Sequence, residues 1–127
     1  ELTQKHEFMI VEGAGGLLVP LSDDCLIADL VRQIGLPLII VARTSLGTIN
    51  HTLLTIEAAR TRQLDISGVI YSQVTSRNGL AESCSPEIIS CISGVAMLGT
   101  IPAITNQSDL GKIAEKHLDL SLILRAS

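Results

Sequence analysis

A single carboxylate separates an apolar run from a cluster of glycines near the start of the chain. Residues 8–13 read FMIVEG, and glycines occupy three of the four positions after Glu12. A carboxylate at the carboxyl end of a strand can bind a hard cation such as Mg²⁺ through its oxygens. Glycines let an anionic ligand approach the backbone amides. The pattern favours a site for both ligands, although a solvated strand end and a plain turn would use the same residues.

The sequence LGTINH at 46–51 is the second candidate site. Gly47 and Thr48 precede a predicted helix, and the free amides at a helix N-terminus bind phosphate or carboxylate. Asn50 can add a side-chain hydrogen bond to such an anion. An ordinary helix start, with Thr48 as its N-cap, is the alternative. His51 can act as a general base, but a lone histidine in the first turn of a helix is more often structural or exposed.

The elements that must position these residues alternate along the chain. Short apolar runs predict strands at 8–13, 36–43, 66–74 and 95–102, with an extended piece at 17–21. Helical patterns cover 22–35, 47–62 and part of 75–92, and one or two helices follow residue 102. This order predicts an α/β fold, a parallel sheet with helices on both faces. Ligands bind such sheets at the carboxyl ends of the strands, so we expect the strand ends, Glu12 and Arg43 among them, to share one rim.

Three details of the helices follow from single residues. Ser22 or Asp23 is expected to cap the helix over 22–35, and Gly35 to end it. Pro86 is expected in the first turn of the helix within 75–92, where its missing N–H costs little.

The composition bounds what the chain can be. Its 127 residues suit one domain, and with 46% hydrophobic but only 2% aromatic residues the core must be aliphatic. The net charge of −4 and the absence of a basic run argue against a nucleic-acid partner. No apolar run is long enough to span a bilayer, so no membrane partner is expected. Three widely spaced cysteines show no zinc pattern and indicate reduced thiols in a cytoplasmic protein.

Three motifs together resemble the dethiobiotin synthetases, the ATP-dependent ligases of biotin synthesis with a P-loop NTPase-like α/β fold. They are VEGAGGLLVPL, the run from ADLVRQIG through LGTINHTLLTIEAAR, and LGTIP. The resemblance covers essentially the whole chain, but only the C-terminal half or so of such an enzyme. It implies that residues 1–127 are the C-terminal part of a single domain. The phosphate loop and catalytic lysines would precede them, so no catalytic residue is assigned here and the chain alone is expected to be inactive.

The resemblance also implies a reaction. This family uses 7,8-diaminononanoate, CO₂ or bicarbonate, and ATP as substrates, with Mg²⁺. One amine is carbamated, ATP phosphorylates the carbamate, and the second amine displaces phosphate to close a cyclic urea. Family members are cytoplasmic homodimers.

The resemblance assigns roles to residues of this sequence. Glu12 corresponds to the Mg²⁺ ligand, and a contact to nucleotide and substrate corresponds to Glu12, Gly13, Ala14 and Gly15. The adenine-lining segment corresponds to Pro102, Ala103 and Ile104, and Asp109 to a nearby nucleotide contact. The loop that receives the substrate carboxylate across the homodimer interface corresponds to Gly47, Thr48, Ile49 and Asn50.

One departure and two alternatives accompany this interpretation. Ser72 and Gln73 occupy the adenine-side position where the family usually has asparagine, and a serine cannot offer the paired donor and acceptor of an amide. The departure mildly favours a non-catalytic dimerisation module of the same fold. A cobyrinic acid synthase-like ligase is the other alternative, because VEGAGG is shared with those enzymes.

Overall fold

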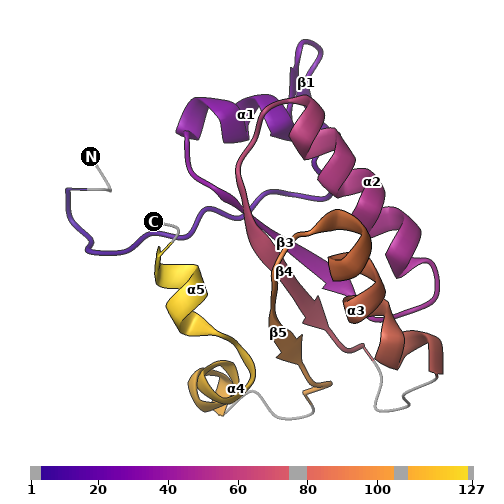
Figure 1. Ribbon diagram of the computed structural model, residues 1–127. Coiled ribbons are helices and arrows are strands. Elements are labelled where there is room, and N and C mark those ends of the chain that lie inside the picture. The colour runs from indigo at the N-terminus through magenta and orange to yellow at the C-terminus, as the bar shows by residue number, and fades with distance from the viewer. Residues whose placement is uncertain (1–3, 75–79, 105–108, 126–127) are drawn as a thin grey trace.

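A computed structural model describes residues 4–74, 80–104 and 109–125, and its centre is a parallel sheet (Figure 1). The strands are β3 (Leu38–Arg43), β4 (Ile66–Ser72) and β5 (Met97–Ile101), in the order β3-β4-β5. Both pairings are parallel. The predicted α/β class with a parallel sheet is therefore confirmed, and three of the predicted strands occur close to their expected positions.

Two helices connect these strands and pack against them. They are α2 (Thr48–Thr61), between β3 and β4, and α3 (Leu80–Ser93), between β4 and β5 (Figure 1). Ile56 of α2 and Ile89 of α3 are buried with Val69 and Tyr71 of β4 in the main core cluster. Burial raises the pKa of the Tyr71 phenol to about 12, and the nearby Glu87 charge adds to this effect. Tyr71 is therefore a neutral core residue at ordinary pH.

The position of Pro86 differs from the prediction. Helix α3 begins at Leu80, so Pro86 lies in the helix interior and not in its first turn. A proline there removes one backbone hydrogen bond. The helix continues because its inner face is held in the core, where Ile89 is fully buried.

A small hairpin and a short helix precede β3. These elements are β1 (Pro20–Ser22), β2 (Cys25–Leu26) and α1 (Ile27–Ile34). The predicted helix over 22–35 is wrong in its first part, because Ser22 pairs with Cys25 and leaves the intervening residues as the hairpin turn. Neither Ser22 nor Asp23 caps the helix; instead the Asp29 carboxylate accepts the Leu26 N–H at 2.9 Å. Gly35 ends the helix in a left-handed conformation, as expected.

Two C-terminal helices close the outer edge of β5. They are α4 (Leu110–His117) and α5 (Leu120–Arg125). Between them, Leu118 forms an antiparallel bridge with Gly99, and the Asp119 N–H donates to the Leu98 carbonyl at 2.7 Å. This edge of the sheet is therefore covered. None of the helices in the described ranges is long and apolar enough to cross a membrane.

The predicted strand at 8–13 does not form. These residues have no strand assignment, and Ile10 is 82% exposed. A strand needs a neighbour for its backbone groups, and no described strand pairs with this segment. The free edge of β3 is likewise unpaired among the described residues, and Val41 in that strand is 69% exposed.

We predict that Gly99→Ala destabilises the fold by about 2–4 kcal/mol. Gly99 has φ +136°, and an added Cβ would collide with the His117 carbonyl oxygen and lie 2.9 Å from the Leu118 Cα. The matched control is Gly111→Ala, where an added Cβ has nothing within 4 Å. Thermal or urea unfolding should show a large loss for Gly99→Ala and no loss for Gly111→Ala. Equal effects would contradict the close approach of Leu118 to β5.

We also predict that the 127-residue chain self-associates through the free edge of β3. An unpaired apolar edge is a template for pairing with another chain. Val41→Lys should reduce association several-fold, because it places a charge on that edge. Leu54→Lys is the control, since Leu54 is 54% exposed but lies on α2. Sedimentation velocity over a concentration series measures the effect, and a wild-type chain that stays monomeric throughout would refute the prediction.

Candidate functional site

The carboxyl ends of the three parallel strands meet in one rim. Arg43 at the end of β3 is in register with Ser72 of β4, which in turn is in register with Ile101 of β5. Two further backbone hydrogen bonds extend the ladder past the strands, from Thr44 N–H to the Ser72 carbonyl at 3.2 Å and from Gln73 N–H to the Ile101 carbonyl at 2.9 Å. The rim predicted from the sequence is thus present for these three strands.

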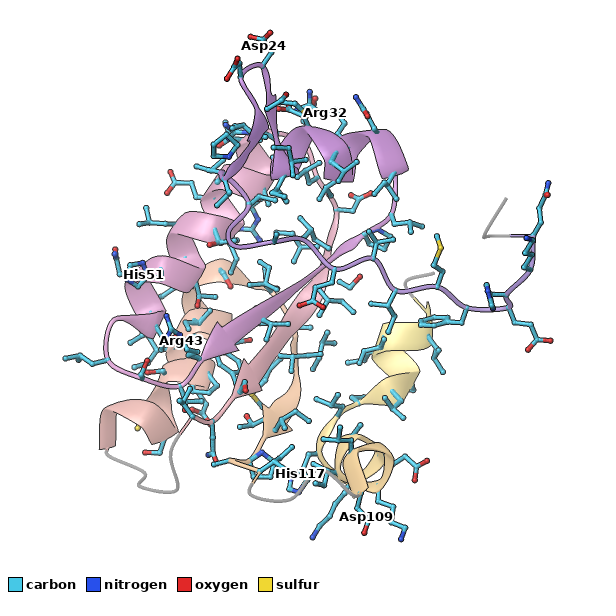
Figure 2. All side chains as sticks on the ribbon, turned by 180° about the vertical axis from the view of Figure 1, so that it is seen from behind. Asp24, Arg32, Arg43, His51, Asp109 and His117 are labelled. Carbon is cyan, nitrogen blue, oxygen red and sulfur yellow. The ribbon has the colours of Figure 1, made fainter. Side chains whose placement is uncertain are left out.

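A groove of about 380 Å³ lies beside this rim, between β3 and the start of α2. Its lining includes Gly16 of the glycine cluster, the end of β3 and the first turns of α2. Figure 2 labels Arg43 and His51, which come from these two neighbouring elements and both line the groove. The groove therefore joins the two segments that carry the candidate motifs.

The start of α2 depends on a glycine. Gly47 is the N-cap residue with φ +91°, and an added Cβ would lie 3.5 Å from Cδ2 of His51. Thr48 is the first helical residue, so the alternative in which Thr48 caps the helix is wrong. Its buried hydroxyl instead lies 3.5 Å from that of Thr52. Gly47 lets the chain turn sharply into α2. The face of α2 that carries the threonine hydroxyls then lines the groove.

The other residues of this turn divide between core and solvent. Ile49 packs against the main core cluster, whereas Asn50 is exposed. His51 is exposed as well, in agreement with the more common role of such a histidine. Its carbonyl accepts a hydrogen bond from the Thr55 hydroxyl at 2.9 Å. Ile49 thus anchors the turn, and Asn50 is available to a ligand or a partner chain.

The glycine cluster packs against Val19 and Ile27, the residues on either side of the hairpin. An added Cβ on Gly13 would lie 3.3 Å from Cγ2 of Ile27, and one on Gly15, with φ +83°, 3.1 Å from Cγ2 of Val19. The Gly16 carbonyl accepts the Val19 N–H at 3.0 Å. Small residues are therefore required for close packing here, and of residues 12–16 only Gly16 lines the groove.

Glu12 lies in the irregular segment and not at a strand end. Its side chain is exposed, and within the described ranges it has no hydrogen bond or ion pair. The described residues contain no group of three or more His, Cys, Asp or Glu side chains that could hold a metal. A magnesium ion is often bound by only one or two carboxylates together with substrate phosphates. A single free carboxylate fits that kind of site.

The residues assigned to the nucleotide lie partly on the rim. Ser72 is the last residue of β4 and Gln73 follows it, and the half-buried residues after β5 are Pro102, Ala103 and Ile104. The Gln73–Ile101 hydrogen bond brings these two segments together. Asp109 is exposed at the N-cap of α4, with an oxygen 3.2 Å from Nζ of Lys112. No described contact joins Asp109 to the rim.

The sequence interpretation missed two groove residues, Thr52 and Thr55. With Thr48 they recur at spacings of four and three, which places all three on one face of α2. That spacing was a usable signal, but it could not show that the face meets β3 rather than solvent.

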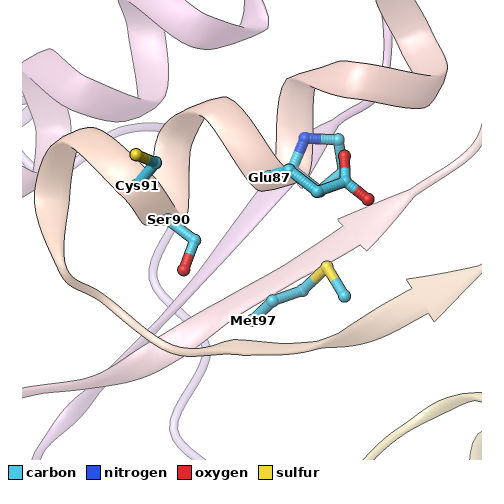
Figure 3. Close-up of a pocket in the computed structure, with 5 residues that line it drawn as sticks. Glu87, Ser90, Cys91 and Met97 are labelled. Carbon is cyan, nitrogen blue, oxygen red and sulfur yellow. The ribbon is translucent and has the colours of Figure 1, made fainter.

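A second hollow, of about 370 Å³, lies between α3 and β5 (Figure 3). Its lining includes Glu87, Ser90, Cys91 and Met97, and none of these residues belongs to either motif. The groove beside β3 is therefore the candidate functional site.

Comparison with known proteins agrees with the motifs. The chain is 40% identical over 126 residues to the ATP-dependent dethiobiotin synthetase BioD of Bacillus licheniformis, covering 98% of this chain and 54% of that protein. It is 42% identical over 123 residues to the protein of the same name from Bacillus velezensis, covering 95% and 53%. The Thermodesulfovibrio yellowstonii protein is 35% identical over 133 residues, covering 97% and 55%. The predicted resemblance is confirmed, and the chain spans about half the length of the curated relatives it matches.

A family model described as an AAA domain matches residues 1–109. This match covers the glycine cluster, the whole groove and all three parallel strands. The chain therefore belongs to the AAA domain family.

Proposed function

We propose that residues 1–127 are the C-terminal part of an ATP-dependent dethiobiotin synthetase. The reaction is the carboxylation of 7,8-diaminononanoate and closure of its cyclic urea, with ATP as co-substrate. The observation that carries the proposal is the groove, because it joins the glycine cluster and the LGTINH segment beside one rim. The names and the 40–42% identity of the Bacillus relatives support the same activity.

Each part of the rim has a role in this proposal. The nucleotide base lies against Ser72, Gln73 and the segment after β5, and its phosphates extend toward Glu12 and the glycine cluster. Glu12 would hold Mg²⁺, and the bound ion would supply positive charge to offset that of the transferring phosphoryl group. The free, exposed carboxylate of Glu12 supports this role. The reacting phosphoryl chemistry itself belongs to residues outside this sequence.

The start of α2 receives the substrate carboxylate. The backbone amides of Gly47 and Ile49 and the side chain of Asn50 supply donors for an anion. The Thr48 N–H donates to the Ser45 carbonyl at 3.1 Å, so Thr48 contributes through its side chain, which lines the groove. Asn50 is exposed, which suits a contact shared with a second copy of the chain in a homodimer. We also propose that the protein acts in the cytoplasm.

Ser72 sets the nucleotide preference in this scheme. A hydroxyl offers one donor and acceptor group, whereas an amide presents a separate donor and acceptor side by side. The half-buried Ser72 therefore recognises adenine less strictly than asparagine would.

The test of the function uses the natural full-length protein that contains this sequence. We incubate it with diaminononanoate, bicarbonate, Mg²⁺ and ATP and measure dethiobiotin by mass spectrometry. Glu12→Gln should lower the rate about 100-fold, because it removes a charged metal ligand and leaves its size unchanged. Glu7→Gln is the control, since Glu7 is an exposed carboxylate in the same segment. No product from the wild type would refute the proposed reaction, and a fully active Glu12→Gln variant would refute the metal role.

A further inference from the structure

We infer that Arg43 is the charged residue of the groove that binds an oxyanion of the substrate, in addition to the backbone donors of α2. The inference rests on the proposed function and deepens it, because it names a specificity-determining side chain for the anionic end of the ligand. Arg43 is the last residue of β3 and lines the groove together with Ser45, Thr48 and His51. Arg43 and His51 are labelled in Figure 2.

The first argument is the sign of the charge in the groove. The described residues that line it include a guanidinium, an imidazole and four hydroxyl groups, but no carboxylate. The whole chain, in contrast, has 13 acidic and 9 basic residues and a net charge of −4. A cationic, donor-rich groove in an acidic chain attracts anions and not cations.

The second argument compares Arg43 with the other arginines whose side chains are described. Arg32 donates to the Arg62 carbonyl at 3.0 Å, Arg60 to the Ser93 carbonyl at 2.6 Å and Arg62 to the Ala58 carbonyl at 3.3 Å. Each of these guanidinium groups is thus used to satisfy a main-chain oxygen near the end of a helix. Arg43 has no hydrogen bond or ion pair of this kind within residues 4–74, 80–104 and 109–125. Among the arginines whose side chains are described, only Arg43 has no such bond to a main-chain oxygen.

The third argument is that the base of the Arg43 side chain is fixed. Its backbone is in register with Ser72, and the next residue, Thr44, is buried and hydrogen-bonded to the Ser72 carbonyl. Only the side chain is free to adjust. A guanidinium on a fixed strand end can form two parallel hydrogen bonds to a carboxylate or a phosphate, which a point charge cannot do.

The test is equilibrium binding to the full-length protein by calorimetry, which requires no turnover. The probes are 7,8-diaminononanoate, its methyl ester, which lacks only the carboxylate charge, and inorganic phosphate. The variants are Arg43→Gln, Arg43→Lys and the control Lys116→Gln, which removes the same charge from an exposed site on α4. Arg43→Gln should weaken binding of the acid about tenfold or more and leave the ester within twofold of the wild type. Arg43→Lys should be intermediate, and Lys116→Gln should bind like the wild type.

The outcomes separate this inference from the proposed function. In one outcome, the wild type neither binds nor converts diaminononanoate but binds phosphate, and Arg43→Gln weakens that binding. The proposed function then fails, while the inference that Arg43 binds an anion stands, with phosphate as the anion. If the wild type makes dethiobiotin and Arg43→Gln binds both anions normally, the function stands and the inference is overturned. A wild-type protein that binds neither anion also overturns it.

Discussion

The parallel ladder between β3 and β4 is the constraint on which the rest of the structure depends. It pairs Ile40 with Val69 and Ala42 with Tyr71, so these side chains meet α2 and α3 in one core. The same register brings Arg43 level with Ser72. Because side chains alternate along a strand, a slip of one residue would bury Arg43 and expose Ala42. The core and the rim are therefore set by one register and cannot be adjusted independently.

The groove exists because this ladder stops at β3. On the other side of the sheet, β5 is covered by the bridge from Gly99 to Leu118. On the β3 side no described strand follows, and the space next to the strand opens onto the hydroxyl-bearing face of α2. An open strand edge exposes backbone groups and apolar side chains, so it costs stability and invites association. The candidate site thus lies beside an edge of the sheet that no described strand protects.

Glycines at three positions connect backbone conformation to the site. Gly15 and Gly47 have positive φ and lie at the two segments that meet in the groove, and Gly99 admits the chain of Leu118 to the edge of β5. At Gly47 the positive φ alone disfavours a side chain, since an added Cβ would meet His51 at an ordinary 3.5 Å, whereas a Cβ at Gly15 would also press on Val19 at 3.1 Å. These contacts explain why the motifs are rich in glycine even though only Gly16 of the first cluster reaches the groove.

Much of the fold and part of the site could be predicted from local sequence. The helical spacing of Ile49, Leu53 and Ile56 placed α2 to within a residue of its observed bounds, and the apolar runs placed β3, β4 and β5. Such features depend on residues a few positions apart, whose intrinsic preference for helix or strand agrees with the pattern of buried side chains. The motifs also located the start of α2 and the strand ends as the candidate site.

Tertiary structure decided everything that depends on a distant partner. The run at 8–13 has the composition of a strand, but no described strand lies beside it to pair with. At Ser22, pairing with Cys25 in a hairpin prevailed over capping of the helix. The positions of Thr52 and Thr55 in the chain could not show that they line a groove. Nor could position show that Arg43 alone lacks a carbonyl partner among the arginines whose side chains are described. The preference of a segment for helix or strand depends on each residue and its immediate neighbours in the sequence. Pairing, burial and charge environment are fixed only when segments far apart in sequence come into contact.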